Sequence, residues 1–291
     1  MNVGPARIEL TYERLGDPAA PPVLLLMGVG AQLIAWPDGF CAELVGHGLH
    51  VVRFDNRDAG LSTHFPDAPM PDLPAALEGD TSSASYTLSD LAADTVGLLD
   101  ALGLDSAHLV GASMGGMIAQ TVAIEYPERV RSLTSMMATT GDSTVGQASP
   151  EVLATMDGAP PNGRAEVIDR TVRVFQVAGS PAYPATEAEL RERAARSYDR
   201  AHDPLGMARQ ALAVIASGDR TPALRTLTVP TLVLHGADDP LCDPSGGRAT
   251  AEAIPGAELV LVDGMGHNLP PGLWSELTAR IAGLVHRVEA D

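Results

Sequence analysis

The chain has 291 residues, of which 19 are cationic and 37 acidic, so its formal net charge is −18. Every cation is an arginine, and the sequence contains no lysine. Nucleic acids and anionic membranes are bound by clustered cations, so this composition disfavours both as partners. The missing lysine excludes Schiff-base catalysis and lysine-dependent P-loops.

The first third of the chain predicts the beginning of an α/β domain. No apolar segment of the secretory type stands at the start of the sequence. Residues 7–14 alternate apolar and polar, which is typical of a half-buried strand. Residues 23–27 form a continuous apolar run that ends at Gly28, as a buried parallel strand would. A helix over residues 38–45 and a strand over residues 50–54 are expected next.

Strand and helix patterns then alternate toward the C-terminus. Thr87 and Asp90 have the spacing of a capping box that begins a helix, and Gly103 marks the helix end. The further elements are strands at 108–110, 130–136, 231–235 and 258–262, and helices at 117–126, 247–254 and 273–288. This alternation predicts a mostly parallel, doubly wound sheet with helices on both faces.

Two segments interrupt the alternation. Residues 65–85 are rich in Pro, Ala, Ser and acidic residues without a clear period, and a loop of this length is usually functional or mobile. Residues 139–227 show no strand pattern but carry helical patterns at 187–198 and 205–216. We expect a core domain of residues 1–138 and 228–291 and an inserted helical cap of residues 139–227. The cap would lie over the carboxyl edge of the sheet, where ligand sites of α/β proteins form.

A candidate nucleophile follows the strand at 108–110. The pentapeptide Gly111-Ala112-Ser113-Met114-Gly115 matches the G-x-S-x-G elbow and stands between a predicted strand and a predicted helix. Small residues on both sides of Ser113 permit the sharp turn that exposes its hydroxyl. The amide of Met114, at the helix start, would then point toward developing negative charge.

A serine nucleophile needs a base, and the base needs a carboxylate that orients it. In elbow-type enzymes the chain order is Ser, acid, His, and His267, between the last predicted strand and the last helix, fits that order. Other histidines precede the expected acid or sit in a core strand or the final helix: His47, His50, His64, His108, His202, His235 and His286.

The acid is expected directly after the strand at 231–235. Asp238 and Asp239 both qualify, and Asp239 is favoured because the acid of such loops is commonly third after the glycine, here Gly236. Asp263 is too close to His267 in the chain. A second oxyanion donor is expected after the strand at 23–27, where Gly28 permits close approach and the Val29 amide would complete the hole with Met114.

Together these motifs resemble the α/β-hydrolase superfamily, over the sheet regions 6–137 and 228–291. The string Asp55-Asn56-Arg57-Asp58-Ala59-Gly60-Leu61-Ser62 is similar to a loop of that family with a structural role near the site. Met27-Gly28, Trp36-Pro37-Asp38 and Gly264-Met265-Gly266-His267 resemble the aclacinomycin methylesterase type of polyketide ester hydrolase. The longer loop at 65–85 and the cap depart from that type, and both shape the substrate pocket.

The resemblance implies acyl transfer without a metal or an organic cofactor. Ser113 would attack an ester carbonyl, His267 would act as base, and Asp239 would orient His267. The substrate implied is a small or medium apolar ester, or a methyl ester. A lactonase, a C–C hydrolase, a perhydrolase or haloperoxidase, and a receptor-like ligand-binding protein are the alternatives. The missing lysine argues against plant-type hydroxynitrile lyases.

The remaining expectations concern the environment of the protein. Two cysteines, Cys41 and Cys242, are too few for a disulfide framework and indicate a reduced, cytoplasmic protein. The longest apolar stretches have about five residues, far fewer than a membrane span needs. The sequence makes no prediction about the oligomeric state.

Overall fold

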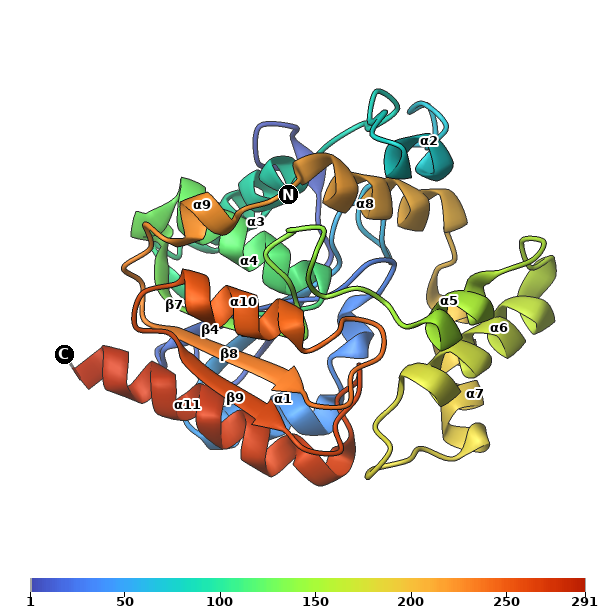
Figure 1. The fold of residues 1–291 in the computed structure, drawn as a ribbon. Coiled ribbons are helices and arrows are strands. Elements are labelled where there is room, and N and C mark those ends of the chain that lie inside the picture. Colours follow the sequence, from blue (N-terminus) through green and yellow to red (C-terminus); the bar gives the residue numbers. More distant parts are fainter. Residues whose placement is uncertain (1, 291) are drawn as a thin grey trace.

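A computed structural model describes residues 2–290 and contains a seven-stranded sheet at its centre (Figure 1). The strand order is β3-β5-β4-β6-β7-β8-β9, and within it only β3 runs antiparallel to its neighbour. The strands of this sheet are β3 (Tyr12–Leu15), β4 (Pro22–Leu26), β5 (His50–Phe54), β6 (Ala107–Ala112), β7 (Val130–Met136), β8 (Thr231–Gly236) and β9 (Glu258–Val262). The α/β fold class predicted from the sequence is confirmed.

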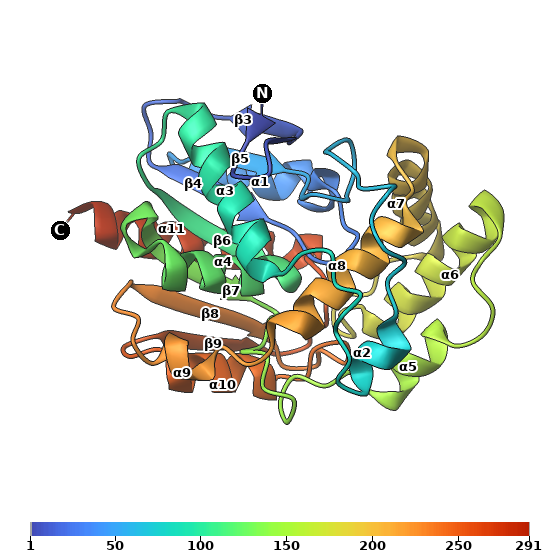
Figure 2. The same cartoon turned by 90° about the horizontal axis from the view of Figure 1, so that it is seen from above.

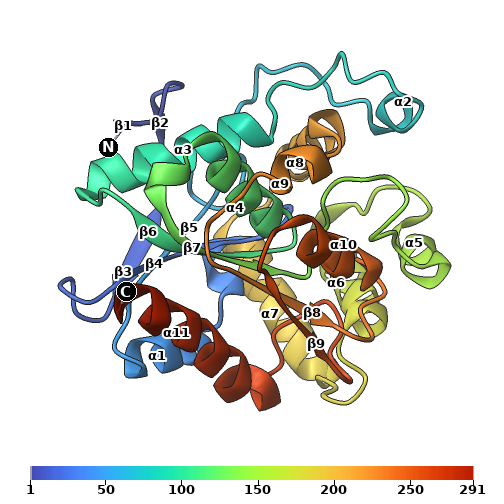
Figure 3. The same ribbon diagram turned by 60° about the vertical axis from the view of Figure 1, so that its left-hand side comes forward.

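Helices cover both faces of the sheet because the central strands are apolar on both sides (Figure 3). Leu24 and Leu26 of β4 face one cluster, whereas Val23 and Leu25 face the other. The first cluster packs against α3 (Leu88–Leu102) and α4 (Met114–Glu125). The second packs against α1 (Asp38–Gly46) and α11 (Trp274–Ala290). Period-two alternation along a fully buried strand therefore builds two cores at once.

Between β7 and β8 the described residues form helices and loops and no strand, and we call residues 139–227 the insert. Its helices are α5 (Pro150–Met156), α6 (Gly163–Ala178), α7 (Glu187–Arg200), α8 (Pro204–Ser217) and α9 (Thr221–Leu224). Helices α5 to α7 lie together beside the sheet, and α8 runs close to α2 (Leu73–Leu77), as Figures 1 and 2 show. The division into a core domain and a cap domain stays a prediction.

The remaining elements complete the chain. They are strands β1 (Asn2–Val3) and β2 (Ile8–Glu9), helix α10 (Ser245–Ala253), and the short 3-10 helices η1 (Leu33–Ala35), η2 (Pro127–Arg129) and η3 (Pro271–Leu273). Across residues 2–290 every helix is too short or too polar to cross a membrane.

Three local expectations need correction. Residues 7–14 do not form one strand: β2 pairs with β1, whereas β3 pairs with β5. The helix after the elbow begins at Met114 rather than at residue 117, because the turn at Ser113 leads straight into the first helical turn. Residues 65–85 contain the short helix α2, whose first turn is capped by the Asp72 carboxylate.

Candidate active site

Ser113 occupies a strained turn between β6 and α4. Its φ of 57° and ψ of −124° lie in a region that side-chain-bearing residues rarely adopt. The flanking glycines make the turn possible: a Cβ on Gly111 would lie 2.1 Å from the Gly115 carbonyl oxygen, and one on Gly115 would lie 2.1 Å from that of Leu26. The sharp turn leaves the Ser113 side chain half-buried at the start of α4.

His267 and Asp239 form a hydrogen-bonded pair. Nδ1 of His267 lies 2.7 Å from Oδ2 of Asp239, whose side chain is fully buried. The other carboxylate oxygen accepts hydrogen bonds from the backbone N–H groups of Leu241 and Cys242, each at 2.9 Å. These three donors fix the carboxylate and hold the imidazole with Nε2 as its free nitrogen.

Asp238 is directed elsewhere. Its side chain is exposed and accepts a hydrogen bond from the Gly264 N–H at 2.8 Å. The two neighbouring carboxylates therefore bind different groups. Asp239 binds the imidazole of His267, and Asp238 binds the loop on which His267 lies. Among residues 2–290 Ser113 and His267 form no hydrogen bond with each other, and such bonds often tighten only with substrate in place.

The insert holds the loop on which His267 lies. The backbone N–H of His267 donates to the Ala178 carbonyl at 2.7 Å. The Ser180 hydroxyl accepts from the Gly266 N–H at 2.9 Å and donates to Oδ1 of Asn268 at 2.5 Å, so it bonds to both neighbours of the histidine. The sequence analysis did not identify Ser180, because nothing in its local pattern relates it to residues 86 and 88 positions away.

The loop after β4 approaches Ser113 closely, and we call residues 27–32 the β4 loop. A Cβ on Gly28 would lie 3.0 Å from the Ser113 Cβ and 3.4 Å from its Oγ, which accounts for glycine there. The Gly28 carbonyl accepts from the Ala31 N–H at 3.2 Å. Among residues 2–290 the N–H of Val29 makes no hydrogen bond, so it is available to a ligand beside Ser113.

The loop after β5 supports the β4 loop, and we call residues 55–62 the Asp55 loop. The buried Asp55 carboxylate accepts from the Leu33 N–H at 2.6 Å, and Nδ2 of Asn56 donates to the Met27 carbonyl at 3.1 Å. Arg200 of α7 adds an ion pair to Asp55 at 2.8 Å. The family resemblance implied a structural role for the Asp55 loop. In the structure that role is to fix both ends of the β4 loop.

Other titratable groups near the site are unsuited to catalysis. Burial lowers the pKa of His235, whose Nε2 donates to the Cys242 carbonyl at 2.7 Å, so its ring is neutral. Burial raises the pKa of the Cys242 thiol, and it raises that of Cys41 to about 11. Both thiols are therefore protonated at neutral pH, and neither is a nucleophile.

One group of side chains has the composition of a metal site. Ligand atoms of Asp58, His64 and Asp203 lie within 4.8 Å of one another. However, Arg209 donates to both oxygens of Asp58 at 2.8 Å, so a cation already neutralises that carboxylate. The donor set is thus better explained as an ion-pair cluster than as a metal centre.

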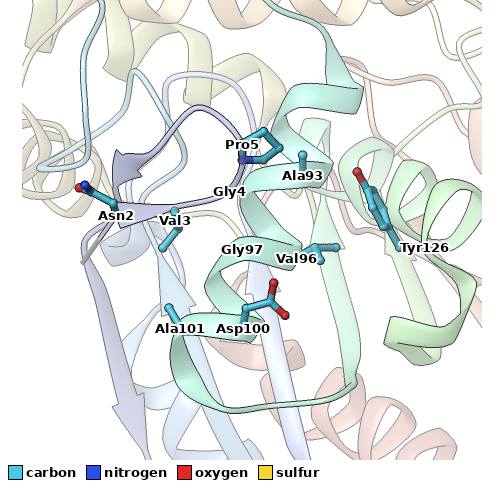
Figure 4. Close-up of a pocket in the computed structure, with 10 residues that line it drawn as sticks. All are labelled: Asn2, Val3, Gly4, Pro5, Ala93, Val96, Gly97, Asp100, Ala101 and Tyr126. Atoms are coloured by element: carbon cyan, nitrogen blue, oxygen red, sulfur yellow. The ribbon is translucent and has the colours of Figure 1, made fainter.

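A surface hollow lies between the N-terminal segment and α3 (Figure 4). It is lined by Asn2, Val3, Gly4, Pro5, Ala93, Val96, Gly97, Asp100, Ala101 and Tyr126. Tyr126 follows the end of α4 opposite Ser113, so the hollow is remote from the nucleophile. Its lining is mostly small and apolar, with no pairing of a nucleophile and a base, and we assign it no role in catalysis.

Comparison with known proteins identifies the family of the chain. The chain is 31% identical to rhodomycin D methylesterase DnrP of Streptomyces peucetius, over 94% of each protein. It is 29% identical to rhodomycin D methylesterase DauP of Streptomyces sp. strain C5, again over 94% of each. The enol-lactonase of Burkholderia xenovorans LB400 shares the fold, with a TM-score of 0.72 and 23% identity over 99% of this chain and 98% of that one. The alpha/beta hydrolase fold family matches residues 21–270, and the chain therefore belongs to that family.

Proposed function

We propose that the protein is a serine hydrolase that cleaves a carboxylic ester through an acyl-enzyme intermediate. Ser113 is the nucleophile, His267 the general base and Asp239 the carboxylate that orients the base. The observation that carries the proposal is the 2.7 Å bond between His267 and the buried Asp239. The strained turn at Ser113 adds support, since a nucleophile elbow requires it. The exposed Asp238, which bonds to Gly264 instead, supports the choice between the two carboxylates.

The proposed mechanism follows from the roles of these groups. His267 Nε2 takes the proton of Ser113 as Oγ attacks the ester carbonyl. The N–H groups of Val29 and Met114 bind the oxyanion of the tetrahedral intermediate, and the N-terminus of α4 adds its dipole. The protonated His267 gives its proton to the leaving alcohol. Water, activated by the same base, then releases the acid from Ser113.

The proposed substrate is a small or medium apolar ester, or a methyl ester. Support comes from the two relatives, which are named as methylesterases, and from apolar side chains that the insert leaves exposed. These are Leu153, Met156, Phe175, Val177, Leu205 and Met207. Met207 of α8 packs against the β4 loop, since a Cβ on Gly30 would come within 2.7 Å of its Cγ. An ester with an apolar group would contact such a surface favourably.

Hydrolysis of p-nitrophenyl acetate, butyrate and octanoate tests the proposal. We expect Ser113→Ala to lower kcat by at least about 10⁴-fold and to abolish labelling by a fluorophosphonate. Ser89→Ala, which removes an exposed serine on α3, is the matched control and should leave both signals unchanged. Wild-type turnover in Ser113→Ala would show that the mechanism is wrong.

A second set of substrates defines the reaction class. Methyl esters and lactones of matched acyl length should be compared, with methanol release measured directly. Faster turnover of methyl esters would support the methylesterase assignment, and faster turnover of lactones would replace it by lactonase. A single turnover per protein molecule with every substrate would contradict an enzymatic function and favour a receptor-like protein.

A further inference from the structure

Gln210 is a polar residue of the insert that the proposed mechanism does not use. It lies on α8 with its side chain fully buried. Its Oε1 accepts a hydrogen bond from the Gly30 N–H at 2.7 Å, and its Nε2 donates to the Arg57 carbonyl at 2.6 Å. One side chain thus joins α8 to the β4 loop and to the Asp55 loop, across 180 positions of sequence in the first case.

The two backbone partners explain why the residue is glutamine. The Gly30 N–H can only donate and the Arg57 carbonyl can only accept. A carboxamide satisfies both, a carboxylate would satisfy only the first, and a hydrocarbon of the same length would satisfy neither. A backbone group left without a partner here would destabilise the folded protein. Both hydrogen bonds of the Gln210 side chain therefore contribute to stability.

The position of Gly30 connects this bridge to the proposed oxyanion hole. The hydrogen bond that the Gly30 N–H donates to Oε1 of Gln210 fixes the peptide group between Val29 and Gly30. The bond from Ala31 to the Gly28 carbonyl fixes the preceding peptide group. In a trans peptide the N–H points opposite to the carbonyl, so the second bond turns the Val29 N–H away from Ala31. The two bonds together determine the direction of the Val29 N–H.

The other side-chain hydrogen bonds that hold the β4 loop end on Met27 and Gln32, at its two ends, and not on Gly30. Gly30 has a φ of +67°, a conformation that glycine adopts freely, so the backbone itself does not resist a change. Met207, one helical turn before Gln210 on α8, packs against the same glycine. Two residues of α8 therefore contact the β4 loop at Gly30, between its fixed ends.

From these contacts we propose that Gln210 is a positioning residue that holds the Val29 N–H in place for the oxyanion. This inference rests on the proposed serine hydrolase mechanism and extends it to the insert. Removal of one oxyanion donor costs about 10²–10³ in kcat in a comparable enzyme. A donor that is misdirected rather than lost should cost less, about 10- to 100-fold.

The test compares Gln210→Met with Gln120→Met, using p-nitrophenyl butyrate. Gln120 on α4 is also fully buried and also has two side-chain partners, Ser135 and Arg220, so it matches the loss of buried hydrogen bonds. We expect both variants to lower the melting temperature. Only Gln210→Met should lower kcat by about 10- to 100-fold, with KM changed less than about threefold.

Two further measurements separate positioning from a general loss of structure. A trifluoromethyl ketone, whose hemiketal oxygen mimics the oxyanion, should lose affinity for Gln210→Met in proportion to the fall in kcat/KM. Gln210→Glu keeps the acceptor for the Gly30 N–H and should have a kcat between wild type and Gln210→Met. If Gln210→Met does not fold, Gln210→Asn replaces it, because its side chain is one methylene too short to reach both backbone groups. The same fall in kcat is expected.

The outcomes distinguish this inference from the mechanism on which it rests. Wild-type activity in Ser113→Ala would overturn the mechanism and the inference together. An inactive Ser113→Ala with wild-type kcat in a folded Gln210→Met or Gln210→Asn would overturn the inference alone. Equal kcat losses in Gln120→Met and Gln210→Met, or a loss confined to KM, would also overturn it.

Discussion

The core and the insert differ in the interactions that stabilise them. On each face of the sheet the core buries a large continuous set of apolar side chains. The insert has only a small buried cluster of its own, made of Ile168, Val172, Leu190 and Ala194. The insert also adds Ala213, Leu224 and Leu227 to the apolar cluster of the core. Near the site its directional contacts with the core are polar: Arg200 to Asp55, Arg209 to Asp58, and Gln210 to Gly30.

This difference has a consequence for catalysis. Apolar burial is non-directional, so it can build a stable sheet without fixing individual loops. Hydrogen bonds and ion pairs are directional, and those of the insert end on the β4 loop, the Asp55 loop and the loop of His267. The core therefore supplies the proposed reacting groups, and the insert supplies the contacts that orient the loops carrying them.

The largest effect should come from a core change that leaves the insert untouched. Replacing Asp239 by Asn keeps the size and the acceptor for Leu241 and Cys242 but removes the charge that pairs with His267. We expect Asp239→Asn to lower kcat by about 10⁴-fold. Asp238→Asn, the matched control on the exposed neighbour, should change kcat less than about fivefold. Our assignment is wrong if Asp238→Asn is the more damaging change.

An insert change should instead lower stability. Arg209→Met removes the cation beside the fully buried Asp58 carboxylate, which Tyr86 also contacts at 2.7 Å. Breaking a buried pair from one side costs about 3–5 kcal/mol. Arg164→Met is the control, because it breaks a solvent-screened pair with Asp199 on the same insert, and the side chains of that pair are about half exposed.

Urea unfolding followed by circular dichroism measures both variants. The midpoint should fall strongly for Arg209→Met and hardly at all for Arg164→Met, with the m-value unchanged. The double variant Asp58→Asn with Arg209→Met should recover part of the loss, since no unpaired charge is then buried. Equal midpoints for the two single variants would show that buried polar contacts do not hold the insert to the core.

The same division explains what could be predicted from the sequence. The strands at 50–54, 130–136 and 258–262 have the predicted ends, because turn-forming residues border them, such as Gly48 before the first and Gly264 after the last. The alternation at 7–14 predicted one strand where two occur, since periodicity does not specify the partner strand. Gln210 was not predicted, because a polar residue on a helix usually faces solvent, and Ser180 was not predicted, because it lies in a loop whose partners are distant in the chain.

The smallest effect should be a pH-dependent contact between the insert and the core. Nδ1 of His64 lies 2.7 Å from Oδ2 of Asp203, and its Nε2 lies 3.0 Å from the Gly60 carbonyl oxygen. Both partners accept hydrogen bonds, so only the doubly protonated imidazolium satisfies both. Burial disfavours that cation, but the bonds to Gly60 and Asp203 raise the pKa of His64 above 6.5.

Because the pKa of His64 is higher in the folded protein, this contact stabilises the protein fully below pH 6.5. The stabilisation is lost as the pH rises through the folded-state value. His64→Gln should therefore be less stable than wild type at pH 6, and the difference should shrink as the pH is raised from 6 toward 9. Since the His64 side chain is 31% exposed, the effect should stay below about 1 kcal/mol. Urea midpoints across this range measure it, with His286→Gln on α11 as an exposed control. A difference that is constant or grows with pH would mean that the neutral ring makes these contacts, and that the insert is held here without a charge.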